Sequence, residues 1–417
     1  MEKSGKFRLT SLERNWILYD VGNSAFVLMV ATLIPIFFNA LAAAGGLSSV
    51  EYLAYWGYAS SAVTIITAVL SPILGTVADT KGFKKPIFIL CVFVGIVGCC
   101  AMGAVSAWLP FLVIFVIAKV GFSGSLVFYD SMLSDVTTPE RMDEVSSRGY
   151  AWGYIGSCIP FVACLGLVLG AGSIGISQMT ALNLALLLTA AWWLLTTLPL
   201  LKSYKQLYYV EVEKHAVRQS FARIGHTLRH LPEDKQVFWF LLAFFCYIDG
   251  VYTIIDMATA YGTALGLDTT GLLLALLVTQ IVAFPSALIF GRLSNKYPSA
   301  KLIPVCIAAY AGIAVFAFFL TQQWQFWVLA VIVGMFQGGV QALSRSHFAK
   351  IIPPEKSGEY FGLFDICGKG ASFLGTMIVS VGSQLTGSAN VGVGSLIVLF
   401  IVGFVLFRVS FRQGETV

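Results

Sequence analysis

The sequence predicts an all-α integral membrane protein in which twelve transmembrane helices form two six-helix bundles. Hydrophobic residues make up 58% of the 417 residues and charged residues only 11%, and the mean hydropathy is +0.83. This composition is typical of membrane proteins and excludes a soluble enzyme. The one long polar run, Lys202 to Gln236, lies near the midpoint and carries too much charge to lie in hydrocarbon.

Twelve apolar segments follow one another along the chain, each close to the roughly 20 residues that a helix needs to cross a hydrocarbon core of about 30 Å. The expected spans are 15–43, 52–78, 86–106, 109–132, 147–170, 178–200, 237–264, 270–292, 302–321, 324–347, 359–386 and 389–408. Six precede the polar run and six follow it. The predicted domains are therefore an N-terminal bundle at residues 1–200, a cytoplasmic linker at 201–236 and a C-terminal bundle at 237–417.

The basic residues predict the orientation in the membrane. With the N-terminus in the cytoplasm, the loops on the opposite side carry only Glu51 and Asp268 and contain no Lys or Arg. Both termini are therefore expected in the cytoplasm. We expect a bacterial inner membrane, although a eukaryotic organelle membrane would give the same orientation. The net charge of +5 follows from this asymmetry and does not indicate a nucleic-acid partner.

Patterns typical of cofactor or metal sites are missing from the sequence. His226 and His230 are four residues apart, but Thr227 and Leu228 stand where a zinc protease motif has Glu. The eight cysteines lie in apolar runs, where they cannot form a disulfide framework for extracellular loops. We therefore expect no cofactor, no metal and no enzymatic activity, and we expect a functional monomer whose energy source is a gradient.

The two halves of the chain are related by an internal repeat. A displacement of 216 residues aligns the loop after the second segment with the loop after the eighth. The aligned pairs are Gly75 with Gly291, Asp79 with Asn295, and Lys85 with Lys301. This relationship predicts two bundles of similar structure.

The loop after the second segment resembles the signature loop of the major facilitator superfamily. The residues that carry the resemblance are Gly75, Asp79, Gly82, Lys84 and Lys85. The resemblance implies that Asp79 accepts hydrogen bonds from the N-terminus of the eleventh helix, near Ser357 to Tyr360, and latches the cytoplasmic side shut. Thr80 and Phe83 stand where family members usually have Arg, so we expect a sparser charge network around this latch.

Three longer stretches resemble the vacuole-effluxer-like branch of this superfamily, which includes autophagy-related amino-acid effluxers. These stretches are Asn15 to Phe26, Phe128 to Ser157 and Gln341 to Thr376. The resemblance covers essentially the whole chain. It implies the major facilitator fold and a secondary transporter of amino acids or similar small polar solutes, with helices 1, 4, 7 and 10 lining the pathway.

A few polar and ionisable residues fall inside the apolar segments, where a charge costs at least about 2.5–3.5 kcal/mol. They are therefore candidates for the solute and proton pathway. The candidates are Tyr19, Asp20, Asn23, Lys119, Ser123, Asp130, Asp249, Tyr252, Asp256, Gln337, Gln341, Asp365 and Lys369.

Position along each helix predicts different roles for these residues. Lys119 and Asp249 both lie near the midplane, so we expect an ion pair across the cavity, unless the pair is purely structural. Asp20 and Asp130 lie near the cytoplasmic face, where gating or helix capping competes with solute or proton contact. Asp365 and Lys369 are spaced i,i+4 and can neutralise each other as a packing pair.

The function predicted from these features is transport of small polar or zwitterionic, amino-acid-like solutes by alternating access, coupled to protons. In this hypothesis a solute carboxylate engages Lys119 and releases Asp249 to bind a proton. Two alternatives remain open. A carrier of amphipathic lipids would have fewer charges at the midplane, and a nutrient sensor would carry a longer signalling domain than this chain provides.

Overall fold

Each of the twelve apolar segments is helical in the computed structural model, which describes residues 7–211, 225–227 and 229–414. The N-terminal bundle consists of α1 (Ser11–Ala31), α2 (Leu33–Ala44), α3 (Ser49–Ala78), α4 (Lys84–Met102), α5 (Trp108–Ser131), α6 (Leu133–Val136), α7 (Met142–Leu169) and α8 (Gln178–Ser203). The C-terminal bundle consists of α10 (Lys235–Ala264), α11 (Thr269–Leu293), α12 (Ser299–Phe318), α13 (Gln323–Ile351), α14 (Ser357–Thr386), α15 (Ala389–Gly394) and α16 (Ile397–Gly414). A 3-10 turn at Pro354–Lys356 precedes α14.

Local sequence explains where several helices begin. Thr10 and Glu13 form a capping box at the start of α1, and Ser48 and Glu51 form another at the start of α3. The first and last predicted segments are each divided, because α1 ends before Thr32 and α15 ends before Ser395. Eleven stretches of the described residues are long and apolar enough to cross a membrane. They correspond to eleven of the twelve predicted segments, and the remaining predicted segment, 359–386, coincides with the 30-residue helix α14.

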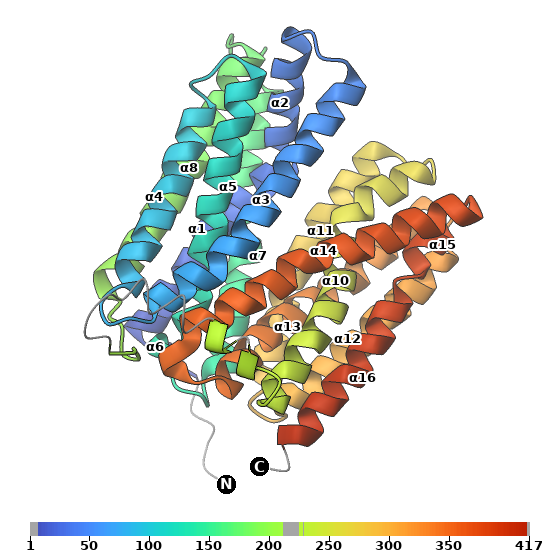
Figure 1. Cartoon of the computed structure of the whole chain (residues 1–417). Helices are drawn as coiled ribbons and strands as arrows, with labels where there is room; N and C mark the ends of the chain where they lie inside the picture. The colour runs from blue at the N-terminus through green and yellow to red at the C-terminus, as the bar shows by residue number, and fades with distance from the viewer. Residues whose placement is uncertain (1–6, 212–224, 228, 415–417) are drawn as a thin grey trace.

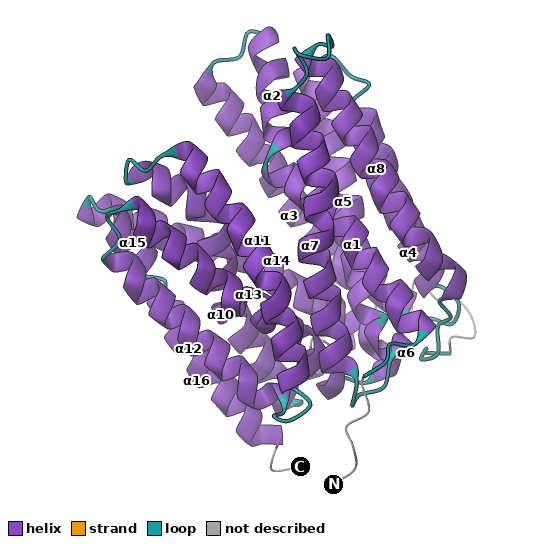
Figure 2. Ribbon diagram, turned by 180° about the vertical axis from the view of Figure 1, so that it is seen from behind, coloured by secondary structure: helices purple, strands orange, loops and turns teal. Residues whose placement is uncertain are grey.

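The two bundles meet at one end of the molecule and diverge at the other, as Figures 1 and 2 show. The start of α1 and the end of α16 lie at the end where the bundles meet, which we call the terminal end. The most extensive contacts between the bundles are those of α3 with α14 and of α7 with α11, and in addition α7 packs on α13 and α5 contacts α14. The repeat seen in the sequence is therefore visible as two equivalent helix pairs.

Polar contacts join the bundles at the terminal end. Lys350 forms an ion pair of 2.7 Å with Asp143, and Ser346 donates to the same carboxylate at 2.6 Å. Asn295 donates to Glu144 at 2.7 Å. We call these contacts, together with the contact of Asp79 described below, the terminal interface.

Candidate functional site

A cavity of about 390 Å³ lies between the two bundles, beyond the terminal interface. Its polar lining comes from α1, α5 and α7 of the first bundle and from α10, α11, α13 and α14 of the second. The predicted residues that line it are Asp20, Asn23, Asp130, Tyr252, Asp256, Gln337, Gln341 and Asp365. The lining residues that were not among the predicted candidates include Ser24, Tyr129, Tyr150, Tyr154, Ser157, Gln280 and Arg345.

Arg345 of α13 connects the two bundles at the cavity wall, and its side chain is only 2% exposed. Its Nη1 atom lies 2.9 Å from Oδ1 of Asp130 and 3.7 Å from Oδ2 of Asp20. Its Nε and Nη2 atoms donate to the hydroxyl and the carbonyl of Ser146 at 2.9 and 3.0 Å. One guanidinium therefore hydrogen-bonds to α5 and α7 and forms an ion pair with α1, which the planar, five-donor geometry of Arg makes possible.

Aromatic rings enclose the same guanidinium. Its central carbon lies 4.3 Å from the ring centre of Tyr150 and 4.7 Å from that of Trp16. Trp16 in turn stacks on Tyr129 at 4.3 Å and donates to its backbone carbonyl. The rings remove water from Arg345, so its interactions with Asp130 and Asp20 act in a medium of low dielectric constant.

The spacing of residues in the sequence indicated that Arg345 could face the cavity, but the predicted end of its helix was too early to support this interpretation. Gln337, Gln341 and Arg345 are spaced by four residues, so they share one face of α13. The segment was expected to end at residue 347, which would leave Arg345 at the membrane surface. α13 continues to Ile351, which places Arg345 about 9 Å inside the helix end.

The expected ion pair between Lys119 and Asp249 is wrong. Both residues belong to the described part of the chain, and Asp249 bonds instead to the Gly375 amide at 2.9 Å and to the Thr253 hydroxyl at 3.3 Å. Asp249 is fully buried where α10 packs on α14. Equal depth along two helices did not reveal that the two side chains face different neighbours.

Lys119 has a different environment from the one expected. Its ammonium lies 4.7 Å from the ring centre of Phe122 and 6.0 Å from that of Phe26. It also interacts electrostatically with Asp256, which lines the cavity. The acidic residue that interacts with Lys119 is therefore Asp256 rather than Asp249.

The other predicted residues divide between the cavity wall and the layer behind it. Tyr19 is buried and donates to Ser125 at 2.7 Å, and Ser123 is also buried within the first bundle. Asp365 lines the cavity and accepts a hydrogen bond of 2.7 Å from Ser71 of the other bundle. Lys369 lies in α14, but its side chain is outside the described residues.

The contact expected between Asp79 and the eleventh transmembrane segment is present. Oδ1 of Asp79 accepts from the Gly358 amide at 2.7 Å, and Oδ2 accepts from the Glu359 amide at 2.8 Å. These are among the first amides of α14, which have no partner within the helix and carry its positive partial charge. Lys84 is fully buried beside them and donates to Ser357 at 2.8 Å.

Glycine permits the close approach behind this contact. A Cβ atom added to Gly75 would lie 2.1 Å from the carbonyl oxygen of Gly358, so the backbones of α3 and α14 touch. At the equivalent place in the repeat, a Cβ atom on Gly291 would lie 2.8 Å from Cβ of Ser147. Asn295, the counterpart of Asp79, contacts Glu144 near the start of α7. Both loops therefore bind the start of a helix in the opposite bundle.

The lining of the cavity combines acidic, basic and neutral polar side chains. Four carboxylates and one guanidinium line it, together with tyrosines and glutamines. Within the described residues, no group of three or more His, Cys, Asp or Glu side chains is placed to hold a metal ion. The arrangement offers separate sites for a cationic and an anionic group.

Comparisons with known proteins agree with this architecture. The family model "Vacuole effluxer Atg22 like" matches residues 11–140 and 134–416. An uncharacterized MFS-type transporter, YxiO of Bacillus subtilis (strain 168), is 43% identical over 414 residues, covering 98% of this chain and 96% of that protein. Autophagy-related protein 22 of Coccidioides immitis (strain RS) is 25% identical over 315 residues, covering 65% of this chain and about half (51%) of the fungal protein.

Solved structures share the fold at low sequence identity. The human organic anion transporter MFSD10 has a TM-score of 0.71 at 15% identity, with 95% of this chain and 99% of that chain covered. The major facilitator superfamily transporter FucP in its outward conformation also has a TM-score of 0.71, at 16% identity, with 96% and 97% covered. The chain is therefore a multi-pass membrane transporter with the major facilitator fold, and it belongs to the Atg22-like vacuole effluxer family.

Proposed function

We propose that this protein moves small zwitterionic, amino-acid-like solutes across the membrane by alternating access and that it couples this movement to protons. The observation that carries the proposal is the charge pattern of the cavity, which is lined by Arg345 and by carboxylates from both bundles. A zwitterion presents a carboxylate and an ammonium group, which require a cationic and an acidic partner respectively.

Arg345 is the proposed partner of the solute carboxylate. Its guanidinium donates in a fork that matches a carboxylate, and it lies at the wall of the cavity. Asp256 and Asp365 lie on α10 and α14 at the same cavity and are the proposed partners of the solute ammonium. The bonds from Tyr154 to Gln341 at 2.8 Å and from Ser71 to Asp365 hold two of the lining side chains in place.

The proposed coupling mechanism uses the acidic residues bound to Arg345. Asp130 and Asp20 compete with a solute carboxylate for the same guanidinium. Protonation of Asp130 removes a negative charge from Arg345 and favours solute binding there, whereas loss of that proton favours solute release. This mechanism replaces the one based on Lys119 and Asp249, because the structure does not bring those two residues together.

Alternating access is supported by the asymmetry between the two ends of the molecule. The terminal interface holds the bundles together at one end, and the bundles diverge at the other (Figures 1 and 2). We assign the terminal end to the cytoplasm on the basis of the loop charges, so that this state would face outward. Separation of the terminal interface would expose the cavity to the other side.

Reconstitution in liposomes tests the proposal. The purified protein is expected to give saturable uptake of zwitterionic amino acids that rises with a pH gradient and falls when a protonophore dissipates it. Asp256→Asn should reduce this uptake, whereas Asp268→Asn in the exposed loop before α11 should leave it unchanged, because Asn also caps helices well. Movement of lipid without amino-acid uptake, or binding without uptake, would contradict the proposal.

A further inference from the structure

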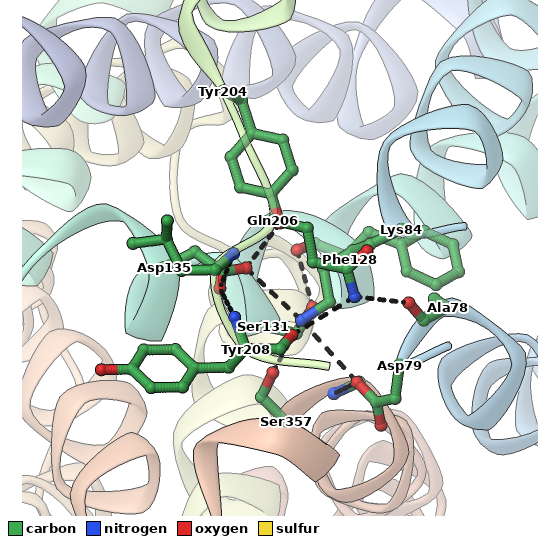
Figure 3. Close-up of polar contacts among 12 residues, drawn as sticks. Ala78, Asp79, Lys84, Phe128, Ser131, Asp135, Tyr204, Gln206, Tyr208 and Ser357 are labelled. Carbon is green, nitrogen blue, oxygen red and sulfur yellow. Dashed lines mark hydrogen bonds and ion pairs between the residues drawn. The ribbon is translucent and has the colours of Figure 1, made fainter. Parts of the chain in front are cut away.

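We propose that the first part of the linker, Tyr204 to Glu211, helps to keep the gate at the terminal end closed. The gate is the contact between the loop of Asp79 and the start of α14. Asp135 is the positioning residue through which the linker acts on it. This inference rests on the proposed alternating access. We call this segment the linker strap. Figure 3 shows it lying beside Asp135, Lys84 and Asp79 at the start of α14.

Asp135 of α6 is the attachment point of the linker strap. Its Oδ2 atom accepts from the hydroxyl of Tyr204 at 2.5 Å. Its Oδ1 atom accepts from the backbone amides of Leu207 and Tyr208, both at 2.9 Å. Three donors from one short segment therefore converge on a single carboxylate that is fully buried.

Lys84 links this carboxylate to the gate. Its ammonium lies 3.6 Å from Asp135 and 3.7 Å from Asp79, and it donates to Ser357 at 2.8 Å. Lys84, Asp79 and Asp135 are all 0% exposed. The contacts therefore run without interruption from the linker strap through Asp135, Lys84 and Asp79 to the first residues of α14.

Backbone contacts fix the other end of the linker strap to the loop that carries Asp79. Val210 donates to the carbonyl of Asp79 at 2.8 Å and accepts from the amide of Lys81, which forms an isolated parallel bridge. Gln206 accepts from the Gly82 amide at 2.9 Å and donates to the Ala78 carbonyl at 3.1 Å. The linker strap thus covers the same loop that binds α14.

Burial makes these contacts interdependent. A buried charge is stable only when its hydrogen bonds and ion pairs are complete, because each missing partner leaves an uncompensated desolvation cost. If the linker strap leaves, Asp135 loses three donors, and water reaches Lys84 and the loop that holds Asp79. Detachment of the strap should therefore weaken the contact between Asp79 and α14, and separation of α14 should in turn loosen the strap.

The ionisation of Tyr204 is consistent with this role. Burial raises the pKa of the Tyr204 hydroxyl well above its ordinary value, and the nearby Asp135 carboxylate raises it further. The hydroxyl therefore remains protonated and donates to Asp135 throughout the physiological pH range. Tyr204→Phe removes this one hydrogen bond and leaves the ring in its place.

Hydrogen exchange resolved at single amides tests the inference without any solute. The amides of Leu207 and Tyr208 report on the linker strap, and those of Gly358 and Glu359 report on the bond to Asp79. Tyr204→Phe is expected to speed exchange at all four amides by about tenfold, the effect of losing one hydrogen bond to a charged group. Tyr208→Phe is the matched control, because that side chain is 39% exposed.

Faster exchange at Leu207 and Tyr208 with unchanged exchange at Gly358 and Glu359 would overturn the inference. Asp135→Ala removes all three acceptor bonds at once and serves as the second variant. Unchanged α14 amides in a folded Asp135→Ala protein, as judged by normal exchange in the core of α16, would overturn it as well. The readout does not require a transported solute, so a failure of the uptake assay is a separate result.

Discussion

The guanidinium Nη1 of Arg345 lies 2.9 Å from Oδ1 of Asp130, although the two residues belong to different bundles. A buried Arg bound to an acidic residue across a domain boundary holds the two domains in one arrangement, because separation would expose or strand both charges. The same pair lies at the wall of the central cavity. In the proposed mechanism, solute binding and bundle closure therefore involve the same atoms.

The first prediction is that Arg345→Lys reduces transport by about 10- to 100-fold. Lysine keeps the positive charge but cannot bond to Asp130 and Ser146 together, and a hydrogen bond to a charged group contributes about 1.5–3 kcal/mol. Uptake into liposomes and elution on size-exclusion chromatography measure activity and folding separately. Arg408→Lys, at an exposed position on α16, is the control and should be silent. Wild-type uptake by Arg345→Lys would rule out the proposed role of the guanidinium.

The second prediction concerns two glycines in α3. Gly75→Ala should push α3 away from α14, because its Cβ would lie 2.1 Å from a backbone oxygen. Overpacking of this kind costs about 1–3 kcal/mol, which shifts the population toward the state open at the terminal end by about 5- to 150-fold. Spin labels at the terminal ends of α3 and α14 should report longer distances.

Gly57→Ala is the matched control for Gly75→Ala. A Cβ atom at Gly57 meets nothing within 4 Å, and Ala favours the helix more than Gly does. The distance distribution should therefore match that of the parent protein. Equal distributions for Gly75→Ala and Gly57→Ala would show that the close approach of α3 and α14 does not control the gate.

The third prediction is that the terminal end faces the cytoplasm. Asp268 and Lys296 are exposed just beyond the two ends of α11, so cysteines placed there sample opposite sides of the membrane. In intact cells an impermeant thiol reagent should modify Asp268→Cys and leave Lys296→Cys unmodified until the cells are opened. The reverse pattern would invert the orientation derived from the loop charges.

Periodic and compositional features of the sequence predicted the fold well. Length and hydropathy located the helices, and the resemblance of the loop around Asp79 to the signature loop of the superfamily predicted its contact with α14. The partners of Lys119 and Asp249 could not be predicted in this way. The direction in which these side chains point depends on how each helix is rotated about its own axis. Packing sets this rotation, for example through the close approach of Gly375 to Asp249, and a single sequence carries little information about the rotation.

The docking of the linker on Asp135 could not be predicted from the sequence either. The polar character of the linker was clear from the sequence, but its docking on Asp135 depends on backbone amides, which every residue other than Pro possesses. The helical segment of the chain that ends in Asp135 and Val136 was also not expected, because it is only four residues long. Side-chain patterns therefore could not identify this attachment.

The last prediction separates the two possible partners of Lys119 with a double-mutant cycle. Asp249 bonds to Gly375 and Thr253, so the effects of Lys119→Ala and Asp249→Asn on solute affinity should add within about 0.5 kcal/mol. Lys119 and Asp256 interact electrostatically, so Lys119→Ala and Asp256→Asn should show a coupling energy above that limit, in the range of about 0.5–3 kcal/mol. Asp249→Asn should also fold normally, because the side-chain oxygen of Asn can still accept from the backbone amide of Gly375. Asp249→Ala leaves the Gly375 amide without its acceptor, so this variant should lower the free energy of unfolding by about 1–3 kcal/mol. Strong coupling between Lys119 and Asp249, together with additive effects for Lys119 and Asp256, would restore the ion pair expected from the sequence and reject the arrangement described above.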